Sequence, residues 1–177
     1  MKNKIQNTLK DNIYDSLRAV LDHLDMPDVP VVFSHSSGLE HKKTYCVVQI
    51  LDRKRVGRVQ ETVGSPIDQD SLNYYTNYYT LYLQVSFVGK DSDDVMAEFE
   101  DSVFSSRACL QFFQKRSLGA IKQSKSRHVP LLRETEWIDA HNIDIDLSYA
   151  VQSHEDIDWI DSFKIKDAYG FDPWQIP

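Results

Sequence analysis

Apolar residues recur at steps of three and four over residues 4–24, which predicts an amphipathic helix with one buried stripe. The stripe consists of Ile5, Leu9, Ile13, Leu17, Val20, Leu21 and Leu24. Pro27 and Pro30 follow it, and proline cannot continue a helix because it lacks the backbone N–H. A second stripe predicts another helix, capped by Asp91 or Ser92 and formed by Val95, Met96, Phe99, Val103, Leu110 and Phe113. Both stripes need a sheet on which to lie.

Period-two alternation and β-branched residues predict the strands of that sheet. Residues 29–36 and 44–51 are expected to form two strands joined by a hairpin-like connection. Residues 75–88 are expected to form a long strand, with a core face over its second half and an amphipathic face that carries Tyr78 and Tyr82. Residues 114–128 are expected to be irregular. The last three strands are predicted within residues 129–140, 142–151 and 157–168.

The order of these elements predicts one α+β domain over residues 1–168, a mainly antiparallel sheet with two α-helices packed on one face. Residues 169–177 are expected to form a C-terminal arm that carries Phe171 and Trp174. Residues 52–71 are interpreted as a long loop, an unusual feature of a compact domain and often a functional one. Four bases lie near its start: Arg53, Lys54, Arg55 and Arg58.

Composition narrows the classes of function. The 177 residues suffice for one domain with its own core, and the net charge of −7 argues against a surface built for duplex DNA. Cys46 and Cys109 are isolated in the sequence, which predicts buried thiols in a reducing compartment. No apolar run approaches the roughly 18 residues of a membrane span, and the N-terminus does not resemble a signal peptide. No membrane partner is expected.

Charge is distributed unevenly along the chain. Residues 107–127 hold six bases and no acids, including Lys115 and Arg116, whereas residues 133–161 hold nine acids and one base. Three interpretations stay open: independent solvated faces, a local phosphate-binding patch, or complementary faces that meet between copies of the chain. The second of these corresponds to a nucleic-acid-binding module.

The sequence lacks the common motifs of catalytic sites. None of the six histidines has the spacing of a zinc site, and nucleophile elbows, phosphate loops and dinucleotide fingerprints are missing from the sequence. Asp144 and Asp146 lie on one strand face, about 7 Å apart, and could hold a divalent cation in a small hydrolase or nuclease. A solvated strand face is the preferred interpretation. No catalytic residue, metal or cofactor is therefore assigned, and the chain is not expected to be an enzyme.

The element order, together with residues 79–118, 129–151 and 157–167, resembles the tail-terminator (neck-terminator) proteins of long-tailed bacteriophages. The matching positions are Gly89, Trp137, Asp139 and Asp144, and the resemblance covers about residues 4–168. One departure is visible. The family often carries Arg-Ala shortly after the tryptophan, whereas this chain has Asp139-Ala140-His141. If that arginine forms a salt bridge between subunits in relatives, this chain must close its ring in another way.

The resemblance implies a virion protein, assembled in the host cytoplasm, that works by binding. Such proteins form a hexameric ring that caps the tail tube, stops its polymerisation and joins the tail to the head connector, while genomic DNA passes through. The expected partners are copies of the chain, the tail tube protein, the connector or stopper protein and, as a further candidate, the tail sheath.

Three contact regions are expected under this hypothesis. The loop of residues 53–71 would reach the tube or connector. The strand face with Tyr78 and Tyr82 would meet a neighbouring subunit, and the C-terminal arm would reach an adjacent ring or the sheath. The charged candidates for these interfaces also include Lys115, Arg116, Asp144 and Asp146.

Overall fold

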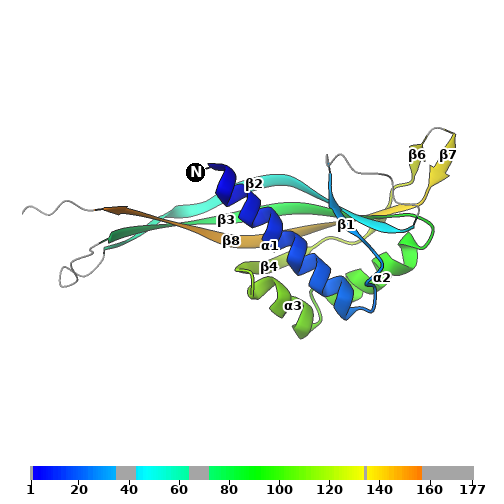
Figure 1. Cartoon of the computed structure of the whole chain (residues 1–177), viewed down its shortest axis with the longest axis horizontal. Helices are drawn as coiled ribbons and strands as arrows, with labels where there is room; N and C mark the ends of the chain where they lie inside the picture. The colour runs from blue at the N-terminus through cyan, green and yellow to red at the C-terminus, as the bar shows by residue number, and fades with distance from the viewer. Residues whose placement is uncertain (1, 35–42, 64–71, 134, 157–177) are drawn as a thin grey trace, which may run out of the picture.

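The computed structural model describes residues 2–34, 43–63, 72–133 and 135–156. Within these residues the chain forms three helices on one side of a single large sheet (Figure 1). The helices are α1 (Lys2–His23), α2 (Ser92–Val103) and α3 (Arg107–Gln114). The predicted α+β class and the placement of helices on one face are confirmed. None of these helices is long and apolar enough to cross a bilayer.

The sheet has the strand order β1-β2-β3-β8-β4, and β5 also pairs with β8. The strands are β1 (Val31–Phe33), β2 (Tyr45–Val63), β3 (Leu72–Val88), β4 (Leu118–Gln123), β5 (Arg127–His128) and β8 (Ala140–Asp156). Strands β6 (Leu131–Arg133) and β7 (Glu136–Ile138) form a separate two-stranded sheet. All neighbours are antiparallel except β1 and β2.

The core lies between the helices and one face of the three long strands. Along β3 every second residue is buried, which confirms the predicted core face: Leu81, Leu83, Val85 and Phe87. Phe87 meets Phe99 of α2 edge-on, with ring centroids 5.2 Å apart. The two cysteines are free and buried, as expected, and burial raises the pKa of Cys46 to about 12.

The prediction of a long loop after residue 51 is wrong for residues 52–63. Strand β2 continues to Val63, so Arg53, Lys54, Arg55 and Arg58 are strand residues. All residues from 51 to 61 are exposed, and a strand with two wet faces shows no apolar alternation in its sequence. The pairing with β3 shifts between Val56 and Gln60, a bulge at which Gly57 has a positive φ of 73°. Residues 64–71 lie outside the described part.

Three further predictions need correction. The hairpin between the first two strands is wrong, because β1 runs parallel to β2 and a hairpin joins antiparallel strands. The segment expected to be irregular contains β4 and β5, which take their pairing from distant β8. Residues 129–140 hold the β6–β7 pair instead of one strand. The predicted strand at 157–168 and the arm at 169–177 lie outside the described residues.

The second predicted helix is two helices, so the sheet carries three helices instead of two. Helix α2 ends at Val103, and Ser106, which has the extended angles φ −79° and ψ 125°, is the N-cap of α3. Serine readily occupies such positions because its short polar side chain competes with helical hydrogen bonding. The break lets Phe104 lie edge-on against Phe113, with ring centroids 6.4 Å apart. The apolar residues of both α2 and α3 therefore pack against the core.

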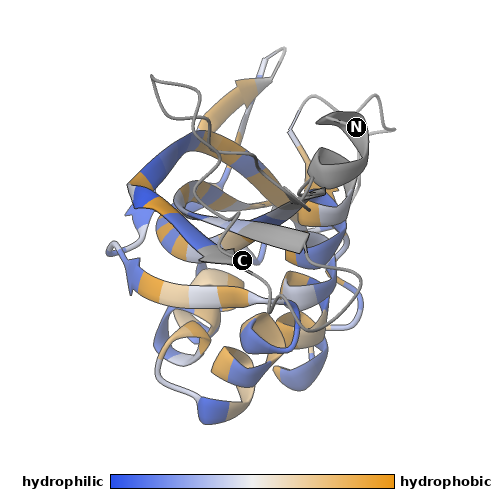
Figure 2. Ribbon diagram, turned by 90° about the vertical axis from the view of Figure 1, so that its left-hand side faces the viewer, coloured by the Kyte–Doolittle hydropathy of each residue, from blue (hydrophilic) through white to orange (hydrophobic). Residues whose placement is uncertain are grey.

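The strands β2, β3 and β8 extend beyond the helices as one projecting unit (Figure 1). We call this unit the sheet arm: residues 51–63 of β2, 72–80 of β3 and 148–156 of β8. Figure 2 views the molecule from the end of the arm and shows the helices gathered on one side of the sheet, with hydrophilic and hydrophobic residues alternating along the strands. Along β2 the arm is exposed on both faces, whereas Tyr149 of β8 is buried and Tyr79 and Val151 pack against the edge of the core.

We expect Gly89→Ala to destabilise the protein more than Gly57→Ala. Both glycines have positive φ, but a Cβ at Gly89 would lie 2.8 Å from the Thr44 Cα, whereas a Cβ at Gly57 meets nothing within 4 Å. Gly57→Ala should cost on the order of 1 kcal/mol of unfolding free energy for its backbone angles alone. Gly89→Ala should cost at least twice that. Urea denaturation of both variants measures the difference, and equal losses would contradict the expectation.

Candidate interaction surfaces

An aromatic stack marks the point where the sheet arm leaves the body. Tyr79 of β3 and Tyr149 of β8 are direct cross-strand partners, and their rings stack with centroids 5.3 Å apart. The Arg53 guanidinium lies 4.0 Å from the Tyr79 ring centroid and 5.5 Å from that of Tyr149. Burial raises the pKa of Tyr149, the Arg53 charge opposes this shift, and Tyr79 adds to it. The stack holds one basic side chain of β2 against the sheet.

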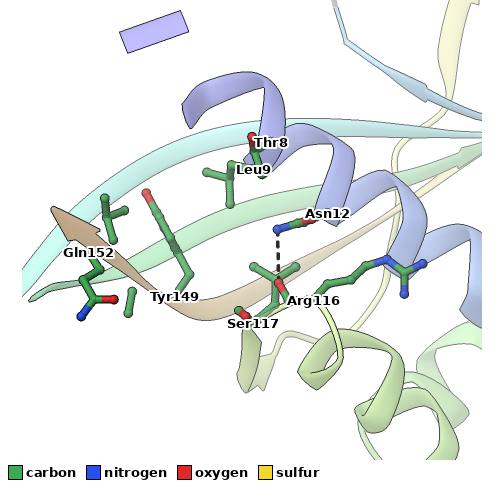
Figure 3. Close-up of a pocket in the computed structure, with 10 residues that line it drawn as sticks. Thr8, Leu9, Asn12, Arg116, Ser117, Tyr149 and Gln152 are labelled. Atoms are coloured by element: carbon green, nitrogen blue, oxygen red, sulfur yellow. Dashed lines mark hydrogen bonds between the residues drawn. The ribbon is translucent and has the colours of Figure 1, made fainter. Parts of the chain in front are cut away.

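A cavity of about 230 Å³ lies beside this stack, between α1, the segment after α3 and β8 (Figure 3). Asn12 of α1 donates a hydrogen bond across it to the Arg116 carbonyl oxygen, at 3.3 Å. The Arg116 Nε lies 3.4 Å from an Asp15 carboxylate oxygen. The full lining is Thr8, Leu9, Asn12, Arg116, Ser117, Leu118, Tyr149, Ala150, Val151 and Gln152. A lining rich in apolar, amide and hydroxyl groups suits contact with a partner better than acid–base chemistry.

The face of the sheet opposite the helices carries the two predicted aspartates, and here the structure places them side by side as expected. Arg127 lies 2.5 Å from Asp144, and Lys122 lies 3.3 Å from Asp146, so each carboxylate has a cation from the same chain. A cavity of about 330 Å³ adjoins both aspartates. Asp146 is only 8% exposed, which corrects the interpretation of this face as fully solvated.

The surroundings of Asp144 and Asp146 do not favour a metal site. In the part of the chain that the structure describes, no three His, Cys, Asp or Glu side chains gather closely enough to hold a metal ion. A cation site would also have to displace Lys122 and Arg127, which already neutralise the two carboxylates. The same ion pairs bear on the charge asymmetry of the sequence. Two of the bases in residues 107–127 meet two of the acids in residues 133–161 within one copy, not between copies.

The β6–β7 pair presents an apolar surface that sequence reasoning missed. Trp137 is 69% exposed and Leu132, its cross-strand partner, is 58% exposed. Leu131 beside them is also exposed. The sequence offered a signal in the alternation of large apolar and charged residues through this segment, but that pattern predicted a strand with a buried face. Exposed apolar clusters of this kind commonly mark protein contacts.

The sequence of the chain matches a known protein family. A family model described as phage neck terminator protein matches residues 9–169. The chain belongs to this family. A search of the curated proteins finds no match. The neck terminator is thus a structural protein of the phage tail and neck, located in the virion, and it interacts with other tail or head proteins. Its family is not one of enzymes.

The predicted interface residues of this neck terminator lie on several different surfaces. Tyr78 is exposed on the face opposite the helices and donates a hydrogen bond to Gln60 at 3.2 Å, while Tyr82 adjoins the cavity over the aspartates. Lys115 follows α3 and lies 6.0 Å from the Phe112 ring, on the helical side with Arg116. Phe171 and Trp174 lie outside the described residues.

We expect Mg²⁺ and Mn²⁺ to leave the thermal stability of this neck terminator unchanged. A metal present at 100 times its Kd would add about 2.7 kcal/mol, or roughly 5–11 °C in the unfolding midpoint of a domain of this size. Scanning calorimetry with and without millimolar metal makes the measurement. The Asp144→Asn, Asp146→Asn double variant is the control. A metal-dependent rise in the natural chain that the double variant lacks would establish a metal site.

Proposed function

We propose that this neck terminator forms a ring, hexameric as the family resemblance implies, that caps the tail tube and stops its polymerisation. The ring joins the tail to the head connector or stopper protein, and genomic DNA passes through it. The observation that carries the proposal is the sheet arm. Three strands continue past the helical layer, with every residue from Leu51 to Glu61 of β2 exposed, and an element of that size without a full core of its own needs a partner. The family membership supplies the setting.

Three kinds of contact are proposed, two through described surfaces and one through a segment outside the described residues. The basic stretch of β2 reaches the tube or the connector through Arg53, Lys54, Arg55 and Arg58, now from a strand and not from a loop. The face with Tyr78 and Tyr82 meets the neighbouring subunit, since tyrosine combines apolar area with a polar tip and is enriched at interfaces. The segment with Phe171 and Trp174 reaches an adjacent ring or the sheath.

Charge supports the passage of DNA without specific binding. The chain carries a net charge of −7, and a bore lined with free bases would hold phosphates tightly. Arg116, Lys122 and Arg127 are each paired with an aspartate of the same chain. These pairs reduce the number of bases available to DNA. Assembly in the host cytoplasm, before the DNA-filled head docks, fits this role.

The purified chain, mixed with its tube protein, tests the proposal. Light scattering after size-exclusion chromatography should give the mass of a ring, and electron microscopy should show that added terminator arrests tube elongation. Arg55→Glu with Arg58→Glu should weaken arrest at least tenfold, because two exposed bases of the arm reverse their charge. Lys125→Glu, on an exposed base outside the arm, is the matched control and should leave arrest unchanged.

A chain that stays strictly monomeric, even with tube protein present, would count against the proposal. Unaltered tube lengths at excess terminator would do the same.

A further inference from the structure

Both outer strands of the sheet arm have an edge without a neighbouring strand among the described residues. Strand β1 pairs with β2 only over Cys46–Val48, so the edge of β2 is uncovered from Gln49 onwards. Strands β4 and β5 pair with β8 only between His141 and Tyr149, so β8 is uncovered from Ala150 onwards. Uncovered edges present rows of backbone donors and acceptors that can bind another strand.

The hydrogen-bond directions show which backbone groups face outwards on β8. The carbonyl oxygens of Ala140 and Asp144 accept bonds from Val129 and Ser124, on the side away from β3. Directions alternate along a strand, and the register of β8 with β3 is unbroken to its end. Ala150 and Gln152 therefore direct their N–H and C=O groups away from β3. Val151 directs its groups towards β3.

The two free edges match in direction and in position along the arm. Strands β2 and β8 are both antiparallel to β3 and therefore run parallel to each other. Through Thr76 of β3, Gln60 of β2 lies level with Gln152 of β8, and both occupy the face opposite the helices. In a ring whose copies are related by rotation, the β8 edge of one copy faces the β2 edge of the next.

We propose that the free edge of β8 in one copy pairs, in parallel, with the free edge of β2 in the next, so that the sheet arms join into one continuous sheet around the ring. This inference rests on the proposed ring-forming function. It names the second copy as the occupant because a rotated copy presents to the free edge of β8 a free edge of β2 that runs in the same direction and lies level with it.

Charge also favours the pairing of unlike edges. Two β2 edges together would bring Lys54, Arg55 and Arg58 of both copies together, and such like-charge contacts are unfavourable, so head-to-tail pairing is preferred.

Disulfide trapping in the full-length chain tests the pairing. Gln60→Cys is combined with Gln152→Cys, and in a second variant with Ala150→Cys to allow a register shift of two residues. The native cysteines are buried and should not interfere. Mild oxidation should give a ladder of linked oligomers up to the ring in at least one variant. Gln60→Cys with Val151→Cys, level with the others but on the opposite face, should give at least tenfold less.

A proline pair provides a second readout. Gln152→Pro removes an outward N–H and should keep the unfolding midpoint close to that of the natural chain while raising the monomer fraction at least tenfold. Val151→Pro removes an N–H bonded to β3 and should lower the midpoint as well.

The outcomes separate the inference from the function on which it rests. A ring by native mass spectrometry without face-specific cross-links, or one that survives Gln152→Pro, overturns the edge pairing and leaves the proposed function standing. A chain that remains monomeric with its tube protein overturns both. Cross-links limited to the two outer-face variants support the pairing.

Discussion

The length of the helical layer is the constraint on which this structure depends. Helices cover one face of β2, β3 and β8 over the segment from Leu81 to Phe87, where every second side chain of β3 is buried, and α1 reaches on to the cavity beside Tyr149 and Val151. Beyond that point the same strands continue without a layer to cover them. Their backbone hydrogen bonds remain satisfied by one another, so the arm can extend from a folded body even though it has no core. Its faces and outer edges remain available to partners.

The boundary between body and arm is built from side chains that have both apolar and polar character. Tyr79 and Tyr149 stack where the last core residues end, and Arg53 lies over them. Such groups tolerate partial exposure better than leucine or valine, because each has an apolar body and a polar end. The transition from dry core to wet arm is therefore gradual, which suits a structural neck protein that acts through its shape.

Electrostatic pairing inside the chain changes how its charge pattern is interpreted. A basic segment and an acidic segment, separated in sequence, meet on adjacent strands where Lys122 pairs with Asp146 and Arg127 with Asp144. These pairs reduce the chemistry available to the aspartates and the attraction of the bases for phosphate. Among the described residues Lys54, Arg55 and Arg58 of β2 form no ion pair, so their charge is available to another molecule or another copy.

The sequence by itself determined α1, the start of α2, and the core faces of β3 and β8, because a face buried against another layer imposes a local apolar period. Phe87, Ile143 and Leu147 follow that period and are buried. The sequence alone could not show that residues 52–63 form a strand, that β1 runs parallel to β2, or that Lys122 pairs with Asp146. Those features depend on hydrogen bonds and ion pairs from segments distant in sequence. Only the tertiary structure decides them, since a strand with two wet faces carries no pattern of its own.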